Sequence, residues 1–199
     1  DGAAPGTVTP IPNTRTNMFC SGHTFLLDGR LLVIGGHLGR DGWGEPHTDI
    51  FNFRDPSWTA NDDMWEGRWY PSGCQLANGD VLAISGTVDT FATSASIPEV
   101  WSPTQLNGWR QLTNANRVLA YYPQTYLAPN GKVFIAGPDR ATTYLDTQGL
   151  GAWTTVGNHV QNFQRSYSAS VQYGDGKYVI FGGGDPPSST CETIDLNAG

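Results

Sequence analysis

The feature that most constrains the fold of this chain is a short pattern that occurs four times. Each copy has an apolar strand, an Asp-Gly or Asn-Gly turn, a second apolar strand and a pair of small residues. The copies read "CSGHTFLLDGRLLVIGG", "YPSGCQLANGDVLAISG", "YPQTYLAPNGKVFIAGP" and "YSASVQYGDGKYVIFGG". Asn-Gly or Asp-Gly between apolar runs is a strong hairpin signal, because both central residues of a two-residue turn need positive φ. We therefore predict four β-hairpins in tandem.

The spacing of the copies predicts how the hairpins are arranged. The residue nine places before each turn glycine is Cys20, Tyr70, Tyr122 or Tyr167, and these positions lie 50, 52 and 45 residues apart. That period is typical of kelch-type propeller blades. We predict an all-β, kelch-type β-propeller of about four blades, a section of a seven-bladed propeller, with residues 1–199 as one partial domain. The four residues, here named the ring residues, should occupy equivalent points around the propeller axis.

A tryptophan recurs at the same phase after each of the first three hairpins. A third short strand and a turn lead to Trp58, Trp109 and Trp153. Large aromatic side chains bury much apolar area. We expect these three to fill the wedges between adjacent blades.

Both ends of the chain interrupt the repeat. The start, "GTVTPIPN", reads as an outermost strand without its tryptophan, and the end, "CETIDLN", stops where a third strand should lead to a fourth. Two explanations fit. Either the chain is a piece of a larger propeller, or its first strand completes the last blade and closes a ring of four, since closure removes unpaired strand edges.

Composition narrows the classes of function. The 199 residues include 25 Gly and 13 Pro and carry a net charge of −7 with two lysines. Such a charge repels a phosphate backbone, so nucleic acid is an unlikely partner. There is no apolar stretch long enough to cross a membrane. Only 15% of the residues are charged, a composition that suits a secreted or extracellular protein.

Three cysteines are present, so at least one has no disulfide partner within the chain. Cys74 lies in the first strand of one hairpin and Cys191 in the third strand of another blade. A bridge between them would have to skip a blade, and we expect small buried side chains instead. Cys20 differs, because it is a ring residue beside the ring residue Tyr70 of the next blade.

At this point the sequence resembles a known family. The segments "MFCSGHTFLLDGRLLVIGGH", "GRWYPSGCQLANGDVLAISG" and "RSYSASVQYGDGKYVIFGGGDPP" are similar to the propeller of the galactose oxidase and glyoxal oxidase family of copper radical oxidases. The resemblance covers nearly the whole chain and is strongest to the glyoxal oxidase branch.

The resemblance implies a cofactor and a reaction. In the family, the cysteine of the "FC.G" motif forms a thioether bond to the tyrosine of the "RWY" motif, and these residues match Cys20 and Tyr70. The modified tyrosine, here Tyr70, binds copper and holds a radical, while a second tyrosine and two histidines complete the site. Members oxidise a primary alcohol or an aldehyde, or a carbohydrate that carries such a group, and reduce O2 to H2O2. Alcohol oxidation removes two electrons, whereas copper cycling between two states carries one, which explains the need for a second redox centre.

The remaining ligands are not evident in this sequence. Its four histidines are His23, His37, His47 and His159, and none is a ring residue. His159 alone precedes a first strand on the side where the ring residues should lie. By the resemblance, the missing ligands belong to later blades, which another chain or a second copy of this chain would have to supply.

Other residues near the ring have two possible roles. Tyr122 and Tyr167 either line a central pocket or plug the axial channel. Arg68 and Arg165 precede ring residues by two places, so each shares a strand face with a ring residue. Arg68 is therefore a candidate pocket residue, and the alternative for both arginines is a tether between blades that binds carbonyl groups or acidic side chains.

One difference from the galactose oxidase pattern concerns the indole that stacks on the modified tyrosine. Val88 stands near the matching point here, so Trp65 or Trp69 would have to provide the shielding.

Two non-catalytic functions also stay open. One is a kelch propeller module that binds carbohydrate or protein through aromatic loops such as "HLGRDGWGEPH". The other is a structural half-propeller that assembles with a partner or with itself.

Overall fold

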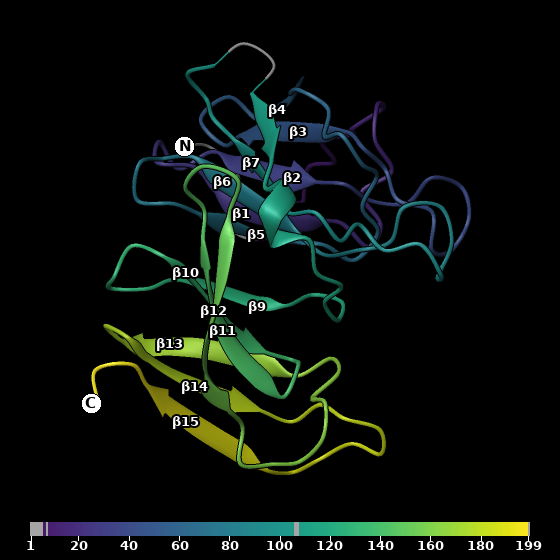
Figure 1. The fold of residues 1–199 in the computed structure, drawn as a ribbon. Helices are drawn as coiled ribbons and strands as arrows, with labels where there is room; N and C mark the ends of the chain where they lie inside the picture. Colours follow the sequence, from purple (N-terminus) through teal and green to yellow (C-terminus); the bar gives the residue numbers. More distant parts are fainter. Residues whose placement is uncertain (1–5, 7, 106–107, 199) are drawn as a thin grey trace.

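The computed structural model describes residues 6, 8–105 and 108–198. In this part of the chain there are fifteen strands and one short 3-10 helix, η1 (Thr113–Ala115). Consecutive strands form four separate antiparallel sheets (Figure 1). The prediction of an all-β propeller arrangement with about four blades is confirmed.

Each sheet corresponds to one copy of the repeat. The first contains β1 (Gly22–Phe25), β2 (Leu31–Ile34), β3 (Thr48–Asn52) and β4 (Ser57–Ala60). The second contains β5 (Ser72–Gln75), β6 (Val81–Ile84), β7 (Glu99–Trp101) and β8 (Trp109–Gln111). The third contains β9 (Gln124–Leu127), β10 (Val133–Gly137), β11 (Ala141–Asp146) and β12 (Ala152–Asn158). The fourth contains β13 (Ala169–Gly174), β14 (Lys177–Phe181) and β15 (Cys191–Asp195).

The hairpin turns differ in detail from the expectation. In the first hairpin, the Leu26 N–H donates to the Arg30 carbonyl at 2.8 Å and the Gly29 N–H donates to the Leu26 carbonyl at 2.9 Å, which gives a three-residue turn. Only the glycine of that turn has positive φ, at 84°. The Asp28 side chain instead accepts the Arg30 N–H at 3.0 Å. The second and third hairpins repeat this arrangement at Asn78-Gly79 and Asn130-Gly131. Asp and Asn are therefore favoured here by this side-chain bond and not by a left-handed backbone.

The sheets pack face to face through apolar residues, as blades do. The inner strands β1, β5, β9 and β13 contact one another in that order. Three core clusters fill the spaces between neighbouring sheets. The first includes Leu32, Ile34, Val81 and Trp101, the second Leu82, Val100, Val133 and Leu145, and the third Phe134, Ala136 and Tyr178.

The recurring tryptophans lie on the outermost strands. Trp109 is buried in the cluster between the first and second sheets, and Trp153 packs against the cluster between the second and third. The wedge role is confirmed for these two. Trp58 pairs instead with Phe51 of its own sheet, and its indole N–H donates to the Ile11 carbonyl at 3.1 Å.

This last contact also bears on ring closure. Ile11 lies against the first sheet, and the fourth sheet has three strands within the described residues. Of the two explanations that the sequence leaves open, completion of the fourth sheet by the first segment is not seen among the described residues. Among the described residues, no helix has the length and apolar character needed to cross a membrane.

Candidate redox site at the propeller axis

The four ring residues share an unusual backbone conformation. Each stands two places before an inner strand, and φ is 62° at Cys20, 66° at Tyr70, 48° at Tyr122 and 58° at Tyr167. This left-handed region is sparsely populated by residues other than glycine. Hydrogen bonds between blades support it, since the Tyr70 N–H donates to the Cys20 carbonyl at 2.9 Å and the Tyr122 N–H to the Tyr70 carbonyl at 3.1 Å.

Cys20 and Tyr70 also influence each other electrostatically. The neighbouring Cys20 thiol, with burial as the second cause, raises the pKa of Tyr70 to about 12. The phenol is therefore protonated at neutral pH.

An indole covers the face of the Tyr70 ring. Trp69 stacks on it with ring centroids 3.7 Å apart and an interplanar angle of 11°. Two backbone hydrogen bonds of 2.9 Å with Thr87 fix the position of Trp69, which is only 5% exposed. Of the two tryptophans considered for this role, Trp69 occupies it. Trp65 is 71% exposed and contacts other residues.

Further tyrosines surround this pair. The ring centroids of Tyr122, Tyr121 and Tyr167 lie 4.7, 5.5 and 6.5 Å from that of Tyr70. Burial raises the pKa values of Tyr121 and Tyr122, so both hydroxyls are neutral hydrogen-bond donors at neutral pH. The sequence analysis did not predict Tyr121 as part of this cluster. The signal that could have indicated it is that Tyr121 directly precedes the ring residue Tyr122.

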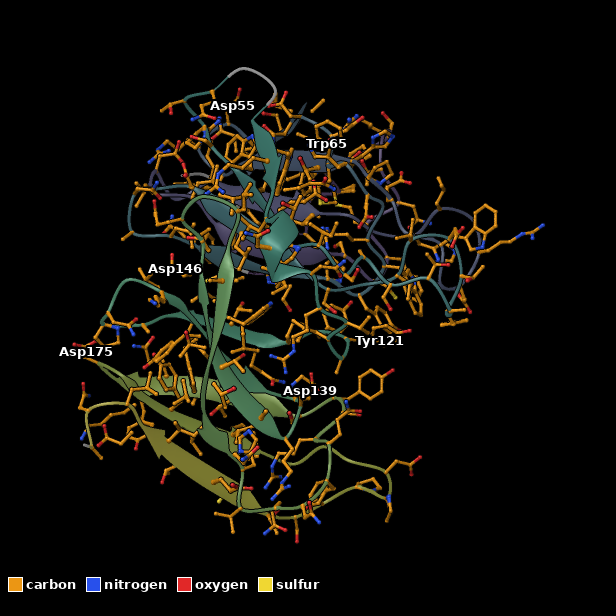
Figure 2. The ribbon with its side chains drawn as sticks, viewed as in Figure 1. Asp55, Trp65, Tyr121, Asp139, Asp146 and Asp175 are labelled. Carbon is orange, nitrogen blue, oxygen red and sulfur yellow. The ribbon has the colours of Figure 1, made fainter. Side chains whose placement is uncertain are left out.

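Two hollows open beside the aromatic cluster. The larger, of about 320 Å³, is bordered by Tyr121, Tyr167 and Gln164, together with Ser94, Val118, Leu119, Ala120, Pro138 and Ser166. Asp139 accepts a hydrogen bond from the Gln164 side chain at 2.7 Å, and Figure 2 shows Tyr121 and Asp139 on neighbouring connections. The smaller, of about 160 Å³, has Tyr122 and His23 in its wall.

Arg68 does not line a pocket, contrary to the sequence expectation. Its side chain is fully buried, and the guanidinium donates to the carbonyls of Ser85 at 3.0 Å and Ile97 at 2.7 Å. It also forms an ion pair with Glu99 at 2.8 Å. The reason is that a buried guanidinium needs acceptors for its donors, and the β6–β7 connection supplies them.

Arg165 has the same arrangement in the fourth sheet. It is fully buried, donates to the Gly182 carbonyl at 2.9 Å and pairs with Glu192 at 2.8 Å. Both arginines are thus tethers, but the partners of each side chain lie in its own sheet, so the expectation of a tether between blades is wrong for these contacts.

The other cysteines do not join the site. Cys74 is buried, and burial raises the pKa of its thiol to about 12, so the thiol is unreactive at neutral pH. Cys191 is exposed, which corrects the expectation of a buried side chain. Its strand β15 has no sheet packed on its outer face among the described residues, and so the side chain faces solvent.

The histidines lie outside the ring. His47 pairs with Asp63 at 2.9 Å, and His37 lies 3.8 Å from Asp41. His159 is buried, with Nε2 2.7 Å from the Ala136 carbonyl and Nδ1 3.4 Å from Glu192. His23 is exposed on β1.

This distribution tests whether the chain could hold copper. In the part of the chain that the structure describes, no three His, Cys, Asp or Glu side chains converge as metal ligands. The ring offers one thiol and three phenols but no imidazole. Copper(II) in a tetragonal site prefers nitrogen and oxygen donors, so the residues described here do not form a complete copper site.

Comparison with known proteins identifies oxidases as relatives. No family model matches the chain. It is 28% identical over 190 aligned positions to a galactose oxidase of Gibberella zeae. That alignment covers 85% of this chain and 26% of the galactose oxidase. It is 30% identical over 142 positions to the aldehyde oxidase GLOX of Vitis pseudoreticulata, covering 65% of this chain and 25% of that protein. The chain thus spans about a quarter of these curated relatives.

A solved structure shares the fold. A fungal alcohol oxidase of the AA5 family, determined in complex with copper, superimposes with a TM-score of 0.74 at 24% identity. The match covers 94% of this chain and 43% of that one. Together these comparisons confirm the resemblance to the galactose oxidase and glyoxal oxidase family.

Proposed function

From its resemblance to the galactose oxidase and glyoxal oxidase family, we propose that this chain is the propeller section of a copper radical oxidase-like protein. The reaction would be oxidation of a primary alcohol or an aldehyde, with reduction of O2 to H2O2. In this proposal Cys20 and Tyr70 form the redox cofactor, and Tyr70 is the one copper ligand that the chain contributes.

The observation that carries the proposal is that Cys20 and Tyr70 are hydrogen-bonded neighbours on adjacent blades, with an indole stacked on the Tyr70 ring. The backbone hydrogen bond between these two residues holds them on adjacent blades. Trp69 covers one face of the Tyr70 ring. A radical on Tyr70 would thus be shielded from solvent and delocalised over a sulfur-substituted ring.

Forming the thioether is an oxidation that must be balanced. The S–H bond of Cys20 and the ortho C–H bond of Tyr70 break, and a C–S bond forms. Two electrons and two protons leave, and one O2 accepts them to give one H2O2. The thioether donates electron density to the ring and fixes its orientation, as a preorganised site requires.

The copper ligands that the ring lacks would come from outside the described residues. The resemblance implies a second tyrosine and two histidines, carried by further blades or another chain. The outer face of the fourth sheet supports additional blades. Val171, Tyr173 and Phe181 are 43–55% exposed there, whereas the equivalent faces of the second and third sheets are covered.

We assign the substrate to the hollow bordered by Tyr121 and Tyr167. Its wall combines aromatic rings with neutral polar groups, such as the side chains of Gln164 and Ser166. Small alcohols, aldehydes or the terminal group of a carbohydrate suit such a lining, because hydroxyl groups need donors and acceptors without a fixed charge. A secreted location and a kelch-type repeat are parts of the same proposal.

Intact-mass measurement tests the cross-link directly. After exposure to Cu²⁺ and O2, we expect the protein to be lighter than its sequence mass by two hydrogen atoms. Cys20→Ser and Tyr70→Phe should keep their full sequence masses, since each removes one partner. An unmodified wild-type mass after this exposure would overturn the thioether assignment, and peroxide release against a panel of aldehydes and primary alcohols then tests the reaction.

A further inference from the structure

A second aromatic site lies at the rim of the propeller, away from the ring residues. Trp65 stands on the connection between β4 and β5, and its ring is 71% exposed. Figure 2 shows it well separated from Tyr121 of the axial cluster. Trp65 is the one tryptophan among the exposed large apolar residues of the described part of the chain.

Trp65 is exposed but held in place. Its backbone N–H donates to Glu99 Oε2 at 2.8 Å, and its indole N–H donates to the Trp109 carbonyl at 3.1 Å. Glu99 itself is fully buried and paired with Arg68. The indole is thus anchored at its backbone and at its ring nitrogen while its face is open to solvent. A ligand that stacks on it would lose little additional side-chain freedom.

Acidic side chains stand beside the indole. Trp65 borders an open hollow of about 530 Å³ whose other wall residues are Asp62, Asp63, Met64 and Trp109. Asp62 Oδ2 accepts hydrogen bonds from the Gly108 N–H at 3.1 Å and the Trp101 indole N–H at 3.4 Å. In the described part of the chain, Oδ1 of Asp62 accepts no bond from the protein. One oriented carboxylate oxygen is therefore open to a ligand.

The charge at this site is partly neutralised. Asp63 Oδ1 accepts from Arg15 at 2.5 Å and lies 2.9 Å from His47 Nδ1. A small cation would therefore find Asp63 already paired. A ligand that offers neutral hydroxyl donors to carboxylate oxygens and apolar C–H groups to an indole face suits this combination better.

We propose that Trp65, Asp62 and Asp63 form a binding site for a sugar residue of an oligosaccharide. One face of a pyranose ring presents C–H groups with partial positive charge, and the face of an indole is negative. The sugar hydroxyls at the ring edge would donate to the two carboxylates, which accept without needing a proton. The site is independent of the Cys20–Tyr70 chemistry and gives the protein a means of holding a glycan chain.

Calorimetric titration with defined saccharides tests this site. The probes are the β-1,4-linked hexasaccharides of glucose, xylose and mannose, with tetramethylammonium chloride as the cationic probe. We expect saturable binding of at least one saccharide, with a Kd on the order of 1 mM, weak as befits a small contact. Trp65→Ala should weaken that binding at least tenfold, and Trp65→Phe should keep part of it.

The control is an exposed aromatic residue elsewhere on the surface. Tyr173 is 55% exposed on the fourth sheet, and Tyr173→Ala should leave saccharide binding unchanged. Circular dichroism of each variant checks that the fold is intact. If no saccharide binds, if Trp65→Ala binds as well as the wild type, or if only tetramethylammonium binds, the proposal is wrong. None of these outcomes depends on the Cys20–Tyr70 cross-link, so the two proposals can fail separately.

Discussion

Ser85 occupies a backbone position that two other sheets give to glycine. It follows the turn glycine of its hairpin by six places, as Gly35 and Gly182 do, and φ is 68° at Ser85 and 67° at both glycines. A residue with a Cβ atom in this left-handed backbone region raises the free energy of the folded state by about 1–2 kcal/mol. Ser85 offsets part of the cost, because its hydroxyl donates to the Ala120 carbonyl at 2.8 Å.

Two substitutions separate these effects. Ser85→Ala keeps the strain and loses the hydrogen bond, so we expect a loss of about 1 kcal/mol in the free energy of unfolding. Ser85→Gly loses the same bond but relieves the strain, and its stability should lie close to that of the wild type. Urea denaturation followed by tryptophan fluorescence measures both. Equal destabilisation by Ala and Gly would show that the backbone strain contributes nothing.

At the residue scale, the sequence placed Cys20 beside Tyr70 but left the stacked indole as a choice between Trp65 and Trp69, and it did not indicate Tyr121. The pair follows from equal spacing in a repeat, which is a one-dimensional property. The stacking of Trp69 depends on the left-handed backbone at Tyr70, and nothing in a tyrosine's preferences predicts that conformation. The contribution of Tyr121 likewise depends on which of two adjacent tyrosines faces the axis.

At the scale of the blade, the buried arginines tie each long connection to its own sheet. Arg68 donates to carbonyls of the β6–β7 connection and pairs with Glu99, and neither side chain is exposed. Removing one partner of a buried ion pair leaves an uncompensated charge, which typically costs 3–5 kcal/mol.

We therefore expect Arg68→Ala to destabilise the protein by about 3–5 kcal/mol in urea denaturation. Arg165→Ala is the matched comparison, since Arg165 makes the same contacts in the fourth sheet but its partner Glu192 is 12% exposed. Water can reach Glu192, so the loss should be smaller. The double variant Arg68→Met, Glu99→Gln removes both charges of the ion pair. It should therefore recover part of the stability that Arg68→Ala loses. A loss as large for Arg165→Ala as for Arg68→Ala would contradict this account of burial.

The hairpins were predictable and their turn type was not. Asp-Gly and Asn-Gly mark the chain reversals because local side-chain chemistry alone favours a turn there. Whether the loop has two or three residues depends on the pairing of the flanking strands. In the first hairpin that pairing extends to Leu26 and Arg30, one pair beyond the ends of β1 and β2.

At the scale of the whole molecule, stability should depend on pH through carboxylates with shifted pKa values. Burial acts to raise the pKa of Glu192, but hydrogen bonds from Arg165 and from the N–H groups of Val160 and Gln161 outweigh it, so the pKa is lowered from 4.5. A lowered pKa stabilises the folded state above about pH 4.5. That contribution is lost as the pH falls through the folded-state value.

Glu192→Gln should consequently be less stable than the wild type at pH 7, and the difference should shrink below about pH 4.5. Thermal denaturation between pH 3 and 8 measures this. Glu45→Gln should change stability in the opposite direction to Glu192→Gln. Burial raises the pKa of Glu45, so the ionised form of Glu45 is disfavoured in the folded protein. This variant should gain stability relative to the wild type as the pH rises above 4.5. Parallel pH profiles for wild type and Glu192→Gln would rule out the role of Glu192.

The order of the sheets followed from the period of the repeat, but the position of the first segment did not. A propeller sequence allows its first strand either to complete the last blade or to lie elsewhere. In this structure the Trp58 indole N–H donates to the Ile11 carbonyl, so residue 11 lies against the first sheet. This position depends on tertiary packing that a repeat period does not encode.

The hydrogen bonds between ring positions have a consequence for protein design. They run from peptide N–H to peptide carbonyl, so the links from Cys20 to Tyr70 and from Tyr70 to Tyr122 do not involve the side chains. The attachment of positions 20, 70 and 122 to the scaffold is thus separate from the side chain that each position displays. A designer could place an imidazole at 122 beside the sulfur and phenol already present, and so build a new metal centre on an unchanged backbone.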